Sequence, residues 1–308
     1  MTLTELRYIV AVARERHFGR AAASCFVSQP TLSVAIKKLE EQLGVTLFER
    51  YQHDVRVTAI GEKIIEQARR VLEEADRIKD IASESENALT GQLKLGVIYT
   101  VGPYLLPKLI PAIHKAAPEL KLVIEENFTH ELGELLRQGE LDMIIVSTPF
   151  TIPTTETRYL YSEPFMVALP MDHPLTRKKS IRLEDLFDET LLLLRTGNCF
   201  RDQVLEACSS CMSQQFSQEN IQKTLEGSSL ETIRQMVAAG TGVTILPATT
   251  ISEGPDMKGH LEYRPFVKPA PERDVILAWR KSYPRTALVD LVENTVGKIR
   301  LRGISIAA

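Results

Sequence analysis

The chain has 308 residues, of which 44% are hydrophobic and 25% are charged, and its formal net charge is −3. This composition is typical of folded soluble proteins, the length predicts two or three domains, and the net charge alone gives no sign of a nucleic-acid partner. No apolar stretch is long enough to cross a bilayer, and the first apolar run, residues 8–13, is too short for a secretory signal. We therefore expect a cytoplasmic protein with no membrane partner.

Residues 18–44 have the layout of a helix-turn-helix, in which two short helices are joined by a tight turn. The apolar turn at residues 25–27 is expected to fill the angle between the helices. In the second helix Ser28 is a good N-cap, and Pro30 lies in the first turn, where its missing N–H costs little. Gly44 is expected to end this helix. Its apolar positions recur at helical spacing and are expected to face the core: Leu32, Ile36, Leu39 and Leu43.

The second helix predicts duplex DNA as a partner, although an ordinary pair of packed helices has the same periodicity. Its polar side chains lie outside the apolar stripe: Gln29, Thr31, Ser33 and Lys37. Gln and Thr can reach base edges, whereas Ser and Lys suit phosphates. Residues 1–57 contain eight Lys and Arg against six Asp and Glu, so they carry +2 and the remainder carries −5. That sign is the one expected of a DNA-reading domain attached to an acidic body.

Two short strands, residues 45–50 and 55–58, are predicted to form a wing with a hairpin at residues 51–54, and Arg50 on this wing can touch the DNA backbone. A helix capped by Thr58 is then predicted to run to about residue 89, roughly 45 Å at ~1.5 Å per residue. Its apolar positions form a heptad-like seam: Ile60, Ile64, Ala68, Val71, Ala75, Ile78 and Ala82. We expect a helix of a second subunit to cover this seam, the alternative being packing against the chain's own body.

After residue 90 the pattern changes to alternating strands and helices, which predicts an α/β domain with parallel strands. Strands are expected at residues 93–98, 120–125, 143–147, 165–169, 191–194, 243–246 and 275–279. Helices are expected at residues 103–116 and 131–138, from about 200, at 229–239 and after 284. The pattern restarts near Pro164, so two lobes are predicted, with a cleft for small ligands between them. The predicted domains are residues 1–58, 59–90 and 91–308, with lobe I at about 91–163 and 268–308 and lobe II at about 164–267.

Cys199 lies at a predicted loop-to-helix transition, where the helix N-terminus and Arg201 should favour the thiolate, the form that oxidises to sulfenic acid. Cys208 follows nine positions later. In one continuous helix the two residues stand roughly 13 Å apart along the axis, whereas a disulfide needs Cα atoms within about 7 Å. A bridge between them therefore requires the helix to unwind, as a redox switch would. The alternative is two unrelated buried cysteines.

Cys208 and Cys211 form a CxxC pair, which is a weak signal alone. A zinc site needs two further ligands, and no second CxxC or HxxxH is present, so no metal is predicted. Cys211 can compete with Cys208 as a resolving thiol. Thr100 and Thr129 follow predicted strands, so their hydroxyls are expected to face the cleft and hold a small polar ligand, although helix capping explains each equally well.

Taken together, these segments resemble the LysR-type transcriptional regulators over essentially the whole chain. Residues 4–50 are close to the most specific signature of that family. Four further segments resemble its hydrogen-peroxide-sensing members: YTVGPYLLPKLIP around Thr100, ENFTH around Thr129, NCFRDQVLEAC, and SSLETIRQMVAAGTGVTILP. The implied fold is a winged helix-turn-helix, a long linker helix and a two-lobed α/β regulatory domain like that of periplasmic binding proteins.

The resemblance also implies roles for particular residues. Cys199 would be the peroxidatic thiol and Cys208 the resolving one, and no cofactor is implied. Peroxide and the reactive sulfur would be held or stabilised by Thr100, Thr129, Arg201, Asp202 and Arg273. DNA would be contacted by Gln29, Pro30, Thr31, Ser33, Lys37 and Arg50.

The implied assembly is a homotetramer, a dimer of dimers, that activates peroxide-defence genes at promoter DNA through RNA polymerase and is reset by a cellular dithiol reductant. One departure is Asn198, because relatives often carry His immediately before the reactive cysteine. Two alternatives stay open: a regulator that responds to a metabolite between the lobes, and a thiol peroxidase. The second would be an enzyme, which the DNA-reading segment and the lack of further catalytic groups argue against.

Overall fold

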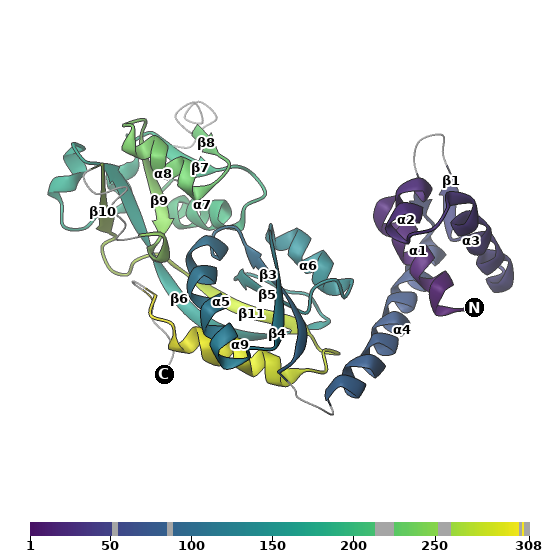
Figure 1. Cartoon of the computed structure of the whole chain (residues 1–308). Coiled ribbons are helices and arrows are strands. Elements are labelled where there is room, and N and C mark those ends of the chain that lie inside the picture. The colour runs from purple at the N-terminus through teal and green to yellow at the C-terminus, as the bar shows by residue number, and fades with distance from the viewer. Residues whose placement is uncertain (51–54, 85–88, 213–224, 252–259, 302–303, 305–308) are drawn as a thin grey trace. The chain divides into compact units, whose positions relative to one another are not determined.

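A computed structural model of the chain describes residues 1–50, 55–84, 89–212, 225–251, 260–301 and 304. The chain divides into two compact units, Met1–Asn87 and Ala88–Ala308. Figure 1 shows the first unit in purple to blue and the second in blue through teal and green to yellow. The hairpin predicted at residues 51–54 lies outside the described residues.

The first unit is a three-helix domain with a short two-stranded wing and a long final helix (Figure 1). Its elements are α1 (Leu3–Glu15), α2 (Phe18–Ser24), α3 (Gln29–Leu43), β1 (Phe48–Arg50), β2 (Val55–Val57) and α4 (Ala59–Glu84). The wing strands are antiparallel, and Phe48 lies opposite Val57. The backbone N–H groups of Leu47 and Phe48 both donate to Glu40 Oε1, at 2.6 and 3.2 Å, which ties the wing to α3.

The predicted helix-turn-helix is confirmed, with two corrections. Ser28 Oγ accepts from the Thr31 backbone N–H at the start of α3, and Gly44 ends the helix with φ +69°. Phe26, however, does not fill the angle between α2 and α3, because it has φ +55° and is 95% exposed. Leu43 was predicted to face the core but is 37% exposed, since it lies in the last turn of α3, just before the stop at Gly44.

Helix α4 packs on the first unit through only part of its predicted seam. Ala68 is buried against the core of this unit, as is the neighbouring Ile65. Other seam positions stay exposed: Ile60, Val71 and Ile78. Packing against the chain's own unit therefore holds for part of the seam, and a second-subunit helix over the exposed part remains a prediction.

The second unit is built on a mixed sheet in the order β4-β3-β5-β11-β6-β9-β7-β8, with β10 paired to β6. The strands are β3 (Gly91–Ile98), β4 (Leu120–Asn127), β5 (Met143–Ser147), β6 (Thr155–Pro170), β7 (Leu191–Leu194), β8 (Leu225–Gly227), β9 (Val243–Pro247), β10 (Leu261–Pro265) and β11 (Glu272–Arg280). The helices are α5 (Gly102–Ala116), α6 (Thr129–Arg137), α7 (Cys199–Met212), α8 (Leu230–Ala238) and α9 (Thr286–Lys298), with short 3-10 turns at Pro174–Arg177, Leu183–Leu186 and Ala248–Thr250.

Strand β6 corrects the predicted restart of the pattern at Pro164. It runs without a break for sixteen residues and passes through that proline. Its first part pairs with β11 and its second part with β9 and β10, so one strand serves both halves of the unit. The strands are also not all parallel, because β11 runs antiparallel to β5 and β6. Pro164 lies opposite Glu272, the first residue of β11, so its missing N–H falls where the β6–β11 ladder ends.

Two hydrophobic cores lie in this unit. One gathers residues between 93 and 161 with residues between 275 and 299, and the other gathers residues between 165 and 266. Strand β11 returns the chain to the first half of the unit, because it pairs with β5. Helices α5 and α9 lie against each other on the first-half sheet (Figure 1). Helix α7 contributes to both cores, because Cys199 packs against the first and Cys208 lies in the second.

Candidate functional site

Helix α7 begins at Cys199 and is continuous to Met212, which confirms that Cys199 and Cys208 share one helix. Gly197 has φ +95°, a backbone conformation that glycine adopts without strain. Asn198 is 5% exposed and its side-chain Oδ1 accepts from the Phe200 backbone N–H at 3.3 Å. Asn198 therefore caps the first turn of α7, and this cap places Cys199 at the positive end of the helix.

The Cys199 thiol lies beside a small polar network at the end of β5. Cys199 Sγ is 3.5 Å from Ser147 Oγ, and the serine is 1% exposed. The Gln203 amide, one turn along α7, donates to Ser147 Oγ at 3.1 Å and to the Thr148 carbonyl at 2.6 Å. These bonds hold the first turn of α7 against the strand, with the thiol half-buried between them.

Cys208, by contrast, lies inside the second core. It is 5% exposed and packs in the same hydrophobic cluster as Phe200 and Val204. Neither Cys199 nor Cys208 is in a disulfide. Because they are nine positions apart in an intact α-helix, about 13 Å of rise separates them, too far for a bridge. The side chain of Cys211 lies outside the described residues, so its competition with Cys208 stays a prediction.

Arg273 contacts Thr100, a second residue of the predicted site. It is 3% exposed on β11, and its guanidinium donates to Thr100 Oγ1 at 2.8 Å and to the Thr100 carbonyl at 3.0 Å. On its other side it forms an ion pair with Glu163 Oε1 at 2.6 Å. Its cationic carbon lies 5.0 Å from the centre of the Phe200 ring, next to the reactive cysteine. Thr100 and Arg273 are thus in direct contact, as a shared site requires.

The sequence interpretation missed Glu163. It is fully buried, and besides Arg273 it accepts from the Thr249 backbone N–H and hydroxyl. In the sequence, a single Glu before a proline gives no local indication that its carboxylate is buried and paired. Only its place opposite Arg273 in the β6–β11 register explains why a carboxylate is buried there.

The remaining predicted ligand residues lie in different surroundings. Arg201 points its guanidinium to the Glu226 carboxylate at 2.6 Å and to the Leu194 carbonyl at 2.9 Å. Arg201 therefore anchors the first turn of α7 to β7 and β8. Asp202, on the same turn, is exposed. Thr129 is the first residue of α6, and its Oγ1 is buried with no hydrogen-bond partner among the residues that the structure describes. An unpaired buried hydroxyl is costly unless a ligand or water satisfies it.

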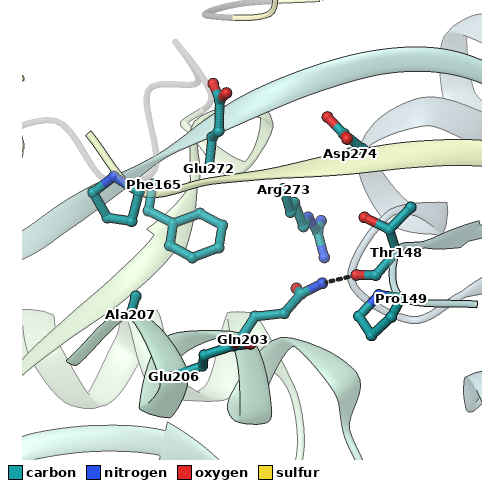
Figure 2. A pocket seen from close by; sticks show the side chains of 10 residues that line it. Thr148, Pro149, Phe165, Gln203, Glu206, Ala207, Glu272, Arg273 and Asp274 are labelled. Atoms are coloured by element: carbon teal, nitrogen blue, oxygen red, sulfur yellow. Dashed lines mark hydrogen bonds between the residues drawn. The ribbon is translucent and has the colours of Figure 1, made fainter. Parts of the chain in front are cut away.

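A cavity of about 360 Å³ lies beside this network, and from α7 it is lined by Gln203, Glu206 and Ala207. Figure 2 shows Gln203 reaching from α7 to the Thr148 carbonyl, with Arg273 and Phe165 over the same space. The acidic lining side chains are Glu206, Glu272 and Asp274. Cys199 does not line this cavity, so the space borders the candidate redox site and does not contain it.

In the first unit, α3 presents the predicted DNA-contacting side chains. Gln29, Pro30, Thr31 and Lys37 are exposed and Ser33 is half-buried. The Thr31 hydroxyl lies 2.8 Å from Ser28 Oγ, and Lys37 Nζ lies 3.9 Å from Glu41 Oε1. The side chain of Arg50 is outside the described part of the chain.

Two further searches concern only the residues that the structure describes. None of their helices is long and apolar enough to cross a membrane. They contain no group of three or more His, Cys, Asp and Glu side chains arranged to bind a metal ion.

Comparison with known proteins gives matches over most of the chain. Residues 3–62 match the bacterial regulatory helix-turn-helix protein, lysR family, and residues 86–297 match the LysR substrate binding domain. The DNA-binding transcriptional dual regulator OxyR of Escherichia coli K12 is 40% identical over 284 residues, covering 92% of this chain and 91% of that protein.

Two solved structures are also similar. A full-length OxyR variant from Pseudomonas aeruginosa is 50% identical with a TM-score of 0.79, covering 98% of this chain and 99% of that one. A hydrogen-peroxide-bound OxyR variant from Corynebacterium glutamicum is 33% identical with a TM-score of 0.63, covering 96% and 91%. With its helix-turn-helix unit and its α/β unit both matched, the chain belongs to the LysR family of transcriptional regulators.

Proposed function

We propose that this chain is a DNA-binding transcription activator of the OxyR type that senses hydrogen peroxide through Cys199. The observation that carries the proposal is the placement of Cys199 and Cys208 at two positions of one helix, both reduced and about 13 Å apart. Two thiols placed in this way can form a disulfide only if the helix between them unwinds. The similarity to OxyR proteins, one of them bound to hydrogen peroxide, supports the choice of oxidant.

The proposed chemistry has two balanced steps. The Cys199 thiolate attacks one peroxide oxygen, the O–O bond breaks, and the leaving hydroxide takes a proton to become water while Cys199 becomes a sulfenic acid. The Cys208 thiol then attacks that sulfur, an S–S bond forms, and the sulfenic oxygen leaves as a second water. One peroxide is reduced by two electrons and two thiols are oxidised to one disulfide. A cellular dithiol returns the pair to thiols by exchange.

Thr129 and Thr100 are proposed to hold the peroxide. The unpaired Oγ1 of Thr129 provides a hydrogen-bonding group that nothing in the described chain uses. Thr100 Oγ1 accepts from Arg273, which leaves its own proton available to a peroxide oxygen. Arg201 and Asp202 are proposed to stabilise the reduced packing of the first turn of α7.

The disulfide is proposed to act by unwinding α7. Bringing the Cα atoms within about 7 Å removes roughly one helical turn's worth of rise from α7, so Cys208 must leave the second core. That change would break the contacts of Arg201 and Gln203 with the neighbouring strands. The rearranged unit would then alter the contact of the assembly with promoter DNA.

The remaining parts of the proposal follow the family pattern. The domains are residues 1–58 for DNA reading, 59–90 for linkage and dimerisation, and 91–308 for sensing, with lobe I at about 91–163 and 268–308 and lobe II at about 164–267. The exposed seam of α4 supports a helix–helix contact between subunits, and we propose a dimer of dimers. The cytoplasmic regulator would activate oxidative-stress defence genes through RNA polymerase, and it would not act as an enzyme.

Peptide mapping of the full-length protein after brief exposure to peroxide tests this proposal. We expect a Cys199–Cys208 disulfide in the native chain and in the matched control Cys211→Ser. Cys208→Ser should stop at a sulfenic acid that dimedone traps, and Cys199→Ser should keep DNA binding but lose the response. A Cys199→Ser protein that still responds to peroxide would overturn the assignment.

The same proteins separate the two alternatives. A metabolite that raises the melting temperature of a cysteine-free variant, with no disulfide in the native chain, would make the chain a metabolite-responsive regulator. Many turnovers of peroxide in the presence of a dithiol, without any change in DNA binding, would make it a thiol peroxidase.

A further inference from the structure

Val34 is the sixth residue of α3, and 68% of it is exposed. With 3.6 residues per turn it stands about 160° around the helix from both Leu32 and Ile36, two of the buried positions of α3. It therefore lies near the middle of the face turned away from the core.

The surroundings of Val34 on this face are exposed and mostly polar. Pro30 and Lys38 lie one turn before and one turn after it, and Thr31, Lys37 and Glu41 flank them, all exposed. Apart from Pro30 in the first turn of the helix, Val34 is the apolar side chain among these neighbours. Valine has a lower helix propensity than alanine, so an exposed valine at this position does not stabilise the isolated unit. Its methyl groups are buried only if another molecule covers this face.

In a helix-turn-helix, the N-terminal part of the second helix enters the major groove of DNA. Val34 lies in that part of α3, beside the side chains predicted to reach base edges and phosphates. It can neither donate nor accept a hydrogen bond, so it cannot read the polar edges of a base pair. The one apolar group that the major groove presents is the 5-methyl of thymine.

We infer that Val34 is a specificity-determining residue whose methyl groups pack on the 5-methyl of a thymine in the bound site. This inference rests on the DNA-reading role of the family and is independent of the response to peroxide. It adds an apolar contact to the polar set predicted from the sequence, and it assigns one base pair of the site as thymine-containing.

The test uses full-length reduced protein and duplexes that it enriches from a random-sequence pool. In the enriched duplex each thymine is replaced in turn by uracil, which lacks only the 5-methyl. We expect one replacement to weaken binding of the native chain about fourfold, the effect of removing one methyl from an apolar contact. Val34→Ala should bind the thymine duplex about fourfold more weakly and should be insensitive to that same replacement.

Val267→Ala is the matched control, because Val267 is another exposed valine, 43% exposed and located in the second unit. It should show the native sensitivity to uracil. The inference is overturned if no uracil replacement weakens binding, or if Val34→Ala keeps the native penalty. A chain that enriches no duplex at all would overturn the DNA-reading role itself, which is a separate result.

Discussion

Arg273 and Glu163 form an ion pair inside the regulatory unit, with 2.6 Å between Arg273 Nη2 and Glu163 Oε1 and at most 3% of either residue exposed. The two residues are 110 positions apart in sequence and stand opposite each other in the β6–β11 register. Each charge is further bonded, Arg273 to Thr100 and Glu163 to Thr249. The pair therefore joins the segment after β3, the shared strand β6 and the turn after β9 at one buried point.

Removal of one partner should be strongly destabilising. Glu163→Gln leaves the Arg273 charge buried without its counter-charge, and we expect the free energy of unfolding of the regulatory unit to fall by about 3–5 kcal/mol. Urea denaturation followed by fluorescence of Trp279, the chain's one tryptophan, reports on this unit because Trp279 lies in its first core. Glu272→Gln, an exposed neighbour, should change stability by at most about 0.5 kcal/mol. Equal stability of the two variants would contradict the structural role of the pair.

Thr129→Val tests the unpaired hydroxyl. The substitution removes a buried polar atom that has no described partner, so the free energy of unfolding should stay level or rise by about 1 kcal/mol. If the hydroxyl holds peroxide, oxidation of Cys199 by peroxide should slow by about tenfold, the value of one hydrogen bond. Alkylation of Cys199 by iodoacetamide serves as the control and should keep its native rate. Parallel slowing of both reactions would indicate a disturbed helix α7.

Lys37→Ala tests the electrostatic contact of α3 with DNA. The Lys37 side chain is 76% exposed, and its distance to Glu41 is 3.9 Å, so it remains available to a phosphate. We expect weaker binding to every duplex and a slope of log affinity against log salt that is smaller in magnitude by about 0.9. Lys179→Ala, on an exposed loop of the other unit, should keep the native slope. An unchanged slope in Lys37→Ala would remove this residue from the interface.

Tyr104 should make the regulatory unit sensitive to alkali. Its hydroxyl donates to Glu231 at 3.0 Å, and burial, followed by the Glu231 carboxylate, raises the pKa of Tyr104. The unfolded chain therefore loses this proton first, near pH 10. The stabilisation that the protonated Tyr104 hydroxyl provides to the folded unit is complete below about pH 10 and is lost as the pH rises above it.

Tyr104→Phe cannot ionise, so its loss of stability between about pH 9 and about pH 11 should be smaller than that of the native chain, as measured by urea denaturation. At neutral pH the same variant should lose about 1 kcal/mol with the hydrogen bond. Some pH dependence should persist, because burial also raises the pKa of Tyr161. Identical pH profiles for the native chain and Tyr104→Phe would show that this hydroxyl does not carry the effect.

The candidate site could be predicted from the sequence only where local spacing decides it. The spacing of nine positions from Cys199 to Cys208 implies their separation as soon as the segment is helical, and the structure makes it helical. The partners of Arg201 show the opposite case. Its nearness in sequence to Cys199 indicated a role beside the thiol, but its guanidinium lies on Glu226 and the Leu194 carbonyl. Backbone spacing does not determine the direction of a long side chain on a helix.

The fold divides in the same way. The caps at Ser28 and Gly44, the stripe of α3 and the alternation of strands and helices were determined by the sequence itself, because each depends on residues within one or two turns. Only the tertiary structure decided that β6 passes through Pro164, that Phe26 points to solvent and that Glu163 meets Arg273. Those outcomes depend on strand register and on packing between distant segments, which bring together residues that no local pattern relates.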